Sequence, residues 1–344
     1  MDIIMNNITK PILSIIVISH NQKEELKRCL NSILAQSIPF EYEILISDDS
    51  SIDGTWDVAQ DYASRYSQIR AYSCNSDDYH PANTSERSGW NRCNAYQHAT
   101  GKYIAHIDGD DFFFKGKNLY QKQVELLELN PSCSCCMAND YDIDEGEDAS
   151  KARIRHKEIF QTGEILSSEE YIKKYFRESH CFVYRKNSDI DPVKQYGGYY
   201  VDSLITDHHI QFGDIVCLND AGYIYVHHKS SIWSQQTKGK DHIVFAHAIY
   251  MGILIPKWKY VFLSTKRHLN MILQVVRLAQ TGYQLREDNL HWIQRFDSYL
   301  YHTFNRKHSY LDKMHLSFLV FYIRSLKLLK PHVKFPYTLL SSLI

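Results

Sequence analysis

The chain has 344 residues and a formal net charge of −1, with 39 Lys and Arg against 40 Asp and Glu. This length predicts one large domain with a smaller appendage. The charge is uneven: residues 240–344 hold 15 Lys and Arg against 5 Asp and Glu, which leaves 24 against 35 in the first 239 residues. No recognised nucleic-acid-binding module accompanies the basic stretch, so nucleic acid is excluded as an expected partner.

The N-terminal stretch predicts a protein that stays in the cytoplasm. Asp2 stands where a signal sequence carries cations, and the apolar run 12–18 is too short to span a membrane. The later run 318–330 is interrupted by Arg324 and Lys327, so we expect no transmembrane helix. The 8 cysteines lack the paired spacing of a zinc site, and we expect them to be reduced and buried in strands.

The first part of the chain alternates between apolar strands and amphipathic helices. We expect strands at 12–18, 43–47, 69–74 and 102–107, and helices at 24–35, 54–66 and 86–99. Short polar turns join them, which predicts a doubly wound, mostly parallel α/β sheet. Such sheets bind ligands beyond the carboxyl ends of their strands, where the segments SHN, DDSS and DGDD fall.

Beyond residue 114 the alternation is less regular. We expect a helix at 119–131, strands at 132–143 and 180–186, a short helix within 199–213 and a last strand from 221. From residue 242 onward, apolar residues recur at helical spacing. The sequence therefore predicts a main domain at 1–239 and a basic, helical C-terminal region at 240–344.

The segment YIAHIDGDDFFF places three carboxylates directly after a predicted strand. Asp108 and Asp110 are one residue apart, a spacing at which two carboxylates can hold Mg²⁺ or Mn²⁺ beside substrate phosphates. Gly109 lets the backbone turn close to a ligand. The alternative is an acidic turn or a helix cap, and this motif alone does not decide. The three phenylalanines are expected to return to the core.

Five separated motifs resemble those of the inverting family 2 glycosyltransferases, which have the GT-A fold. They are VISHN, ILISDDSSIDGT, ATGKYIAHIDGDD, LITDHHI and YIYVHHKSSIW, in the family's order over roughly 11–234. The resemblance implies a nucleotide-sugar donor, with a UDP-sugar favoured, and Mn²⁺ or Mg²⁺ as cofactor. It also implies hexosyl or N-acetylhexosaminyl transfer to a glycan or lipid-linked acceptor, in bacterial surface polysaccharide synthesis.

The resemblance assigns nucleotide contacts to the ends of the first strands. Ser19, His20 and Asn21 stand where the family's first strand ends, and His20 replaces a frequent tyrosine that packs on the base. Asp48 stands where the family accepts a hydrogen bond from the uracil ring. Arg92 matches an arginine that braces the nucleotide site, with an exposed helix arginine as the alternative.

The resemblance also assigns the reacting groups. It implies that Asp108 faces the ribose or a metal-bound water, that Asp110 binds the metal, and that Asp111 supports them. Inversion needs a base for the acceptor hydroxyl. The family's acidic pair reads Thr-Asp here, which makes Asp207 the candidate base, and Asp202 is the alternative.

The segment YVHHKSSIW resembles the family's stretch that closes over the diphosphate. His228 matches a histidine that binds the metal or a phosphate, and His227 is the alternative ligand. Lys229 and Ser231 are expected to contact phosphate.

Two questions stay open at this point. A catalytically silent nucleotide-sugar-binding or scaffold subunit is the alternative function, whereas a dehydrogenase is excluded because no glycine-rich loop follows the first strand. The basic C-terminal region can lie on the inner face of the cell membrane, pack on the main domain or form a homo-oligomer.

Overall fold

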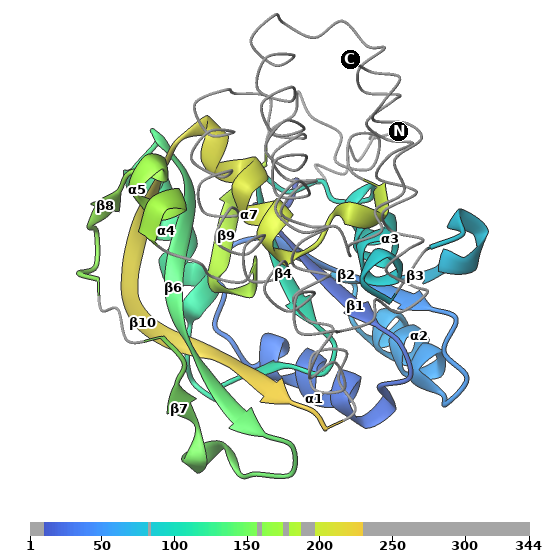
Figure 1. The fold of residues 1–344 in the computed structure, drawn as a ribbon. Helices are drawn as coiled ribbons and strands as arrows, with labels where there is room; N and C mark the ends of the chain where they lie inside the picture. Colours follow the sequence, from blue (N-terminus) through green and yellow to red (C-terminus); the bar gives the residue numbers. More distant parts are fainter. Residues whose placement is uncertain (1–9, 82–83, 157–159, 175–178, 187–196, 230–344) are drawn as a thin grey trace, which may run out of the picture. The chain divides into compact units, whose positions relative to one another are not determined.

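A ten-stranded sheet organises the residues that the computed structural model describes, which are 10–81, 84–156, 160–174, 179–186 and 197–229 (Figure 1). Its main path runs β3 (Ile69–Cys74), β2 (Tyr42–Asp49), β1 (Leu13–Ser19), β4 (Tyr103–Asp108), β9 (Phe182–Arg185), β6 (Cys133–Asp144), β10 (Asp214–His227) and β5 (Phe112–Phe113). β7 (Arg153–Ile154) pairs with β6, and β8 (Ile165–Leu166) pairs with β10.

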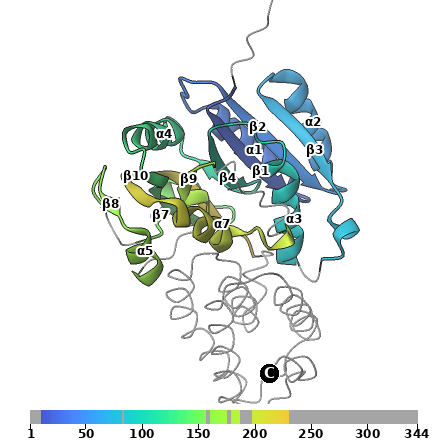
Figure 2. The same cartoon turned by 90° about the horizontal axis from the view of Figure 1, so that it is seen from above.

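The first half of the sheet is parallel, as the alternating pattern predicts. β1 pairs in parallel with β2 and β4, and β2 with β3. All residues of β1 are buried, because helices cover both faces of this half. Helices α1 (Lys23–Leu34) and α2 (Thr55–Arg65) pack into one hydrophobic cluster with β1 and β2, while α3 (Thr84–Tyr96) lies on the opposite face (Figure 2).

The second half mixes parallel and antiparallel pairs. β6 and β10 form a long parallel ladder that curves along one side of Figure 1, and β9 runs antiparallel between β4 and β6. Helices α4 (Leu119–Leu129) and α7 (Asp202–His209) lie close to the predicted positions. Helix α5 (Ser168–Lys174) and the two-residue strands β5, β7 and β8 were not expected from the sequence.

Of the phenylalanines after the acidic motif, Phe113 returns to the core as predicted, whereas Phe112 and Phe114 are partly buried. Phe113 is buried in the main core, and Phe112 and Phe114 pack against a smaller cluster around Ile224. The chain pairs here with β10 through β5, in an antiparallel register. The acidic motif is therefore fixed on both sides, by β4 before it and by β5 after it.

All eight cysteines are free and buried, as predicted, but not all of them lie in strands. Cys29 lies on α1 and Cys93 on α3, where they pack as small apolar side chains. Cys181 lies in a single 3₁₀ turn before β9. The expectation of strand cysteines was wrong at these three positions.

Several predictions fall outside the described residues, namely the boundary at 239/240, the helical C-terminal region and Ser231. In the part of the chain that the structure describes, no helix is both long and apolar enough to cross a membrane.

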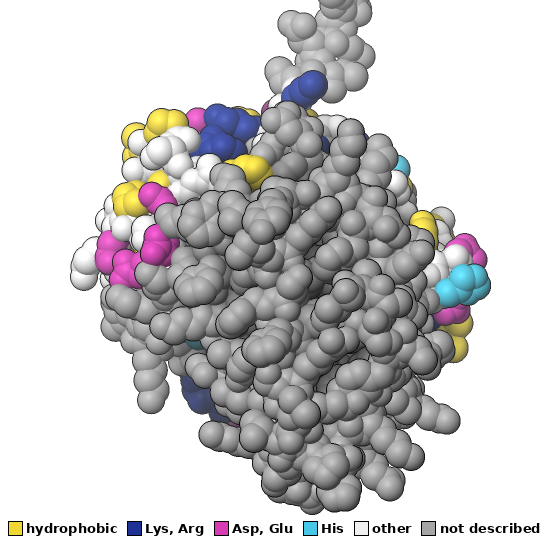
Figure 3. Space-filling model, turned by 45° about the horizontal axis from the view of Figure 1, so that its top comes forward, with side chains coloured by type: hydrophobic (Ala, Val, Ile, Leu, Met, Phe, Trp, Pro, Cys, Tyr) yellow, Lys and Arg dark blue, Asp and Glu magenta, His cyan; other side chains and the backbone are white. Residues whose placement is uncertain are grey.

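Figure 3 shows acidic side chains gathered at the left edge of its view, the side on which Figure 1 draws β8 and α5. Helix α5 carries Glu169 and Glu170 in its first turn, where carboxylates favour a helix N-terminus.

Candidate active site

The polar residues at the carboxyl ends of β1, β2 and β4 meet at one edge of the sheet. In the parallel registers, Ser19 lies beside Asp48, and Ile18 lies beside Asp108. The turn at Gly109 is tight, because its N–H donates to the carbonyl of Ile18 at 2.8 Å. A Cβ atom at this position would stand 2.8 Å from that same oxygen, so the turn requires glycine.

Asp48 is a buried carboxylate held by serines. Its Oδ1 accepts hydrogen bonds from Ser19 Oγ at 2.9 Å and Ser51 Oγ at 2.6 Å, and its Oδ2 accepts from the Ser51 N–H at 3.1 Å. These donors fix the orientation of the carboxylate. The predicted contact between Asp48 and a nucleobase stays a prediction.

His20 is held through both ring nitrogens. Its Nδ1 lies 2.5 Å from the carbonyl oxygen of Asp49, so Nδ1 carries the proton and donates. Its Nε2 then accepts from the Asn21 amide nitrogen at 3.0 Å. Asn21 adopts a positive φ of 53° and accepts the Ile52 N–H at 2.9 Å. His20 therefore presents one tautomer in one orientation at the carboxyl end of β1.

Arg92 joins two carboxylates that are far apart in the sequence. Its Nη2 atom lies 2.6 Å from Asp108 Oδ1 and 3.4 Å from Asp202 Oδ1. The side chain of Arg92 is 4% exposed, against 37% for Asp108 and 35% for Asp202. Burial by itself would lower the pKa of Arg92, but the two carboxylates raise it overall. Arg92 is thus a buried cation beneath two accessible acids, and the interpretation as an exposed helix arginine was wrong.

Asp202 is the first residue of α7, and its carboxylate lies beside the guanidinium of Arg92. Ser179 Oγ donates to its Oδ1 at 2.7 Å. Burial opposes the charge, but Arg92 and the Ser179 hydrogen bond prevail and lower the pKa of Asp202. The side chain of Asp207 lies outside the described residues. Positions 202 and 207 are about 140° apart around a helix axis, so the two positions do not share a face of α7.

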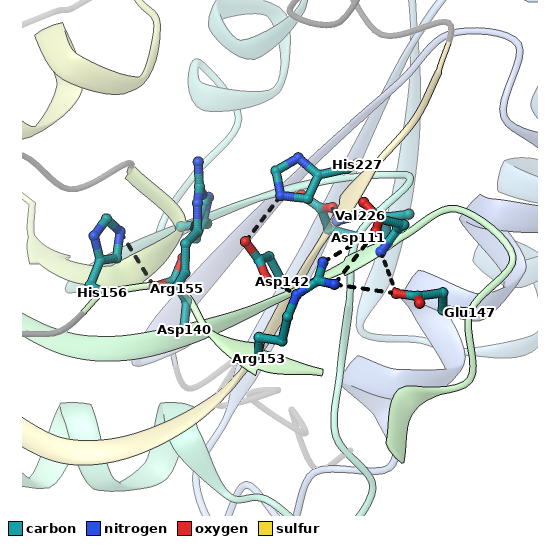
Figure 4. Close-up of polar contacts among 11 residues, drawn as sticks. Asp111, Asp140, Asp142, Glu147, Arg153, Arg155, His156, Val226 and His227 are labelled. Atoms are coloured by element: carbon teal, nitrogen blue, oxygen red, sulfur yellow. Dashed lines mark hydrogen bonds and ion pairs between the residues drawn. The ribbon is translucent and has the colours of Figure 1, made fainter. Parts of the chain in front are cut away.

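Asp110 and His228 face each other across the turn. His228 Nε2 lies 3.5 Å from Asp110 Oδ2, and its Nδ1 lies 3.3 Å from Glu145 Oε1. Burial and the neighbouring Asp108 carboxylate raise the pKa of Asp110 to about 6, against the opposing effect of His228. His227 points elsewhere, toward Asp142 at 3.1 Å (Figure 4).

This pair fits a divalent cation. Two ligands of one ion at about 2.1 Å each lie roughly 3 to 3.5 Å apart, which is the separation of the carboxylate oxygen and the imidazole nitrogen here. The acids crowded around this point are also those that a cation would stabilise. The residues present would hold Mn²⁺ or Mg²⁺ through Asp110 and His228, with Asp108 beside them.

Asp111 is held in place by hydrogen bonds from β10. It accepts a hydrogen bond from the Tyr223 hydroxyl. It also accepts one at 2.8 Å from the N–H of Val226, which lies beside it in Figure 4. Burial, together with the charges of Asp110 and Asp108, raises its pKa well above the usual range. Asp111 therefore ties the turn to β10, and its support of Asp108 and Asp110 at a metal stays a prediction.

Sequence reasoning missed several residues around this site. Arg28 Nη2 donates to the Asp110 carbonyl at 2.6 Å, and Glu145 contacts both His228 and the Lys229 N–H, the latter at 3.3 Å. Ser179 supports Asp202 from the 3₁₀ turn before β9. No motif announces these positions, because each depends on a contact between distant segments. The predicted phosphate role of Lys229 stays a prediction.

The fold is that of the GT-A glycosyltransferases. Residues 1–349 of TarS from S. aureus, solved with UDP-GlcNAc, superpose with a TM-score of 0.55 at 16% identity, over 83% of this chain and 80% of that one. The same fragment with UDP gives a TM-score of 0.53 at 17% identity, over 82% and 78%. At these identities the likeness establishes the fold alone.

The model of the family "Glycosyl transferase family 2" matches residues 14–191, more than half of the chain. The chain therefore belongs to glycosyl transferase family 2, which confirms the resemblance. It is 34% identical over 127 residues to the putative teichuronic acid biosynthesis glycosyltransferase TuaG of Bacillus subtilis, covering 36% of this chain and 45% of TuaG. It is 26% identical over 231 residues to the uncharacterized protein Rv1520 of Mycobacterium tuberculosis, covering 64% of this chain and 60% of that protein. The chain thus spans less than two thirds of these relatives.

Proposed function

We propose that this protein is an inverting glycosyltransferase that moves a sugar from a nucleotide-diphosphate donor to a saccharide acceptor. The observation that carries the proposal is the group Arg92, Asp108 and Asp202, gathered at the carboxyl edge of the sheet beside Asp110 and His228. Family membership supports the glycosyltransferase activity. The site supplies one acid to bind the cation, Asp110, and one to accept the proton of the acceptor, Asp202.

The donor is a UDP-sugar, and its uracil base lies between the ends of β1 and β2. Asp48, fixed by Ser19 and Ser51, supplies an oriented acceptor for the uracil N–H, and His20 supplies a flat ring on which the base can stack. TarS, whose fold this chain shares, is solved with UDP and with UDP-GlcNAc, which supports a uridine donor.

Asp110 and His228 hold the divalent cation, with Asp108 facing the ribose side. When bound, the cation neutralises charge that develops on the departing diphosphate. Burial raises the pKa of Asp108, and Arg92 opposes this effect and holds the carboxylate in place. Lys229 and Ser231 contribute phosphate contacts.

Asp202 is the general base in this proposal, in place of Asp207. It accepts the proton of the acceptor hydroxyl as the C–O bond to the sugar forms and the bond to the diphosphate breaks. Support comes from its position at the start of α7, its accessible carboxylate, and its two fixed partners Arg92 and Ser179. Its lowered pKa keeps it ionised at neutral pH. Asp207 remains the alternative.

The acceptor is a lipid-linked or polymeric surface saccharide. The support is that the relative TuaG is named a putative teichuronic acid biosynthesis glycosyltransferase. The basic region 240–344 would meet an anionic membrane surface on which a lipid-linked acceptor lies. A hexosyl or N-acetylhexosaminyl group is the expected cargo.

A donor screen tests the proposal. The full chain is incubated with UDP-, GDP- and dTDP-sugars, with Mn²⁺, Mg²⁺ or chelator, and release of the nucleoside diphosphate is followed. We expect metal-dependent release from a UDP-sugar. Saturable UDP binding without turnover, with any acceptor tried, would support the scaffold function.

A further inference from the structure

A second group of metal-ligating side chains lies outside the proposed active site. Asp140 belongs to β6, His156 follows β7, and Cys181 lies in the 3₁₀ turn before β9. One ligand atom of each lies within 4.8 Å of the other two, and no other such group of three occurs among the described residues. Figure 4 shows His156 turned toward Asp140.

The carboxylate of Asp140 is the centre of this group. It is fully buried, and its Oδ1 lies 3.5 Å from His156 Nε2. Its other oxygen, Oδ2, accepts from His180 Nε2 at 3.1 Å and lies 3.5 Å from Arg155 Nη1. His180 and Arg155 therefore lie on the Oδ2 side of the carboxylate, while Oδ1 faces the imidazole of His156.

We propose that Asp140, His156 and Cys181 bind a zinc ion. Oxygen, nitrogen and sulfur ligands together favour Zn²⁺ over Mg²⁺ or Mn²⁺, because thiolate is a soft ligand. Ligands of a tetrahedral zinc ion lie about 3.5 Å apart, so closing the set from 4.8 Å needs a movement of roughly 1 Å. His156, whose side chain is 19% exposed, is the most accessible of the three ligands.

The charge and proton balance of the site is favourable. The Cys181 thiol loses its proton to solvent as the Zn–S bond forms, so the ion meets two anionic ligands and one neutral imidazole. Arg155 stays on the far side of the carboxylate, with its guanidinium 4.3 Å from the centre of the Tyr225 ring. His180 acts as the second-layer partner that orients Asp140.

This site is separate from the one at Asp110 and His228 but is connected to it. The His180 ring stacks on Tyr223 at 3.9 Å with an interplanar angle of 2°, and the Tyr223 hydroxyl donates to Asp111. The zinc site would clamp the β6–β7 hairpin to the turn before β9. By holding these segments together, the zinc ion would fix the position of Tyr223, which stacks on His180. It would also fix, through Ser179, the carboxylate of Asp202.

Cobalt substitution tests the proposal and distinguishes the two sites. The full chain is stripped with chelator and titrated with Co²⁺ and, in competition with a chromogenic chelator, with Zn²⁺. We expect one Co²⁺ with a thiolate charge-transfer band, because only the proposed site contains a cysteine ligand. Cys181→Ser should abolish the band, and His180→Gln should weaken Zn²⁺ binding about tenfold.

Cys29→Ser is the matched control, since Cys29 Sγ is the thiol beside Asp108, 3.8 Å from its carbonyl oxygen. It should keep the band. If Cys181→Ser does not fold, His156→Gln, at a partly exposed position, serves instead and should lose Zn²⁺ binding at least tenfold. Co²⁺ binding without a thiolate band, a band that survives both variants, or no Zn²⁺ binding by the folded chain would each overturn the proposal.

Discussion

Arg92 and Asp202 lie 110 positions apart in the chain, yet the guanidinium Nη2 is 3.4 Å from the Asp202 carboxylate. Arg92 comes from α3, on one face of the parallel half of the sheet, and Asp202 begins α7. The same nitrogen lies 2.6 Å from Asp108 at the end of β4. One buried cation thus sets the distance between Asp108 and Asp202, the two acids to which the proposed function assigns the donor side and the acceptor proton.

Arg92→Met should impair both folding and donor binding. The change leaves Asp108 and Asp202 facing each other without their cation, and loss of one partner of a buried pair costs about 3 to 5 kcal/mol. Because both acids are more than one third exposed, we expect about 2 kcal/mol in urea unfolding. The donor KM should also rise.

Arg65→Met is the control for that experiment, because Arg65 pairs with Asp61 on the exposed face of α2. It should change neither the unfolding free energy nor the KM measurably. An Arg92 variant that unfolds like the wild type and binds donor normally would contradict the bracing role.

His228→Gln should reduce metal affinity, whereas His227→Gln should not. His228 faces Asp110 at 3.5 Å, but His227 turns to Asp142. Loss of one ligand should raise the Mn²⁺ concentration for half-maximal activity at least tenfold. Metal titration of donor hydrolysis by the two variants, in parallel with Asp110→Asn, measures this. Equal effects of the two histidine substitutions would remove the assignment of His228.

The protein should lose stability as the pH falls below about 6.5, because of buried histidines. Burial lowers the pKa of His106 to about 3 and that of His208 to about 4. The unfolded chain protonates these rings near 6.5 and so binds more protons between pH 6.5 and the folded pKa. The free energy of unfolding therefore decreases as the pH is lowered, by about 2 kcal/mol per histidine at pH 5.

His106→Phe should remove one such contribution. The drop in unfolding free energy between pH 7.5 and pH 5 should shrink by about 2 kcal/mol. His80→Asn is the control, since His80 is exposed and asparagine accepts its left-handed backbone, φ 48°. An unchanged pH profile in His106→Phe would show that His106 does not titrate on unfolding.

The parallel half of the fold was predictable because strands buried on both faces leave continuous apolar runs, as in LSIIVIS of β1. The strands β5, β7 and β8 have two residues each, too few for any pattern to appear. The acids after β2 and β4 were predictable, since register brings strand ends together. The location of Asp202 was not, because motif spacing cannot say which of two acids begins a helix at the site. The role of His180 was not predictable either, because it depends on the stacking of its ring on Tyr223 in the folded protein.

The turnover of Asp202→Asn beside that of Asp207→Asn tests the central claim most directly. Both variants replace a carboxylate by an amide of the same shape, and both are assayed with a UDP-sugar, metal and acceptor at saturating concentrations. A general base contributes about 10² to 10⁴ in rate. We predict that Asp202→Asn lowers kcat at least a hundredfold with donor binding retained, while Asp207→Asn stays within a few-fold of the wild type. The reverse pattern would contradict the account and return the role of base to Asp207.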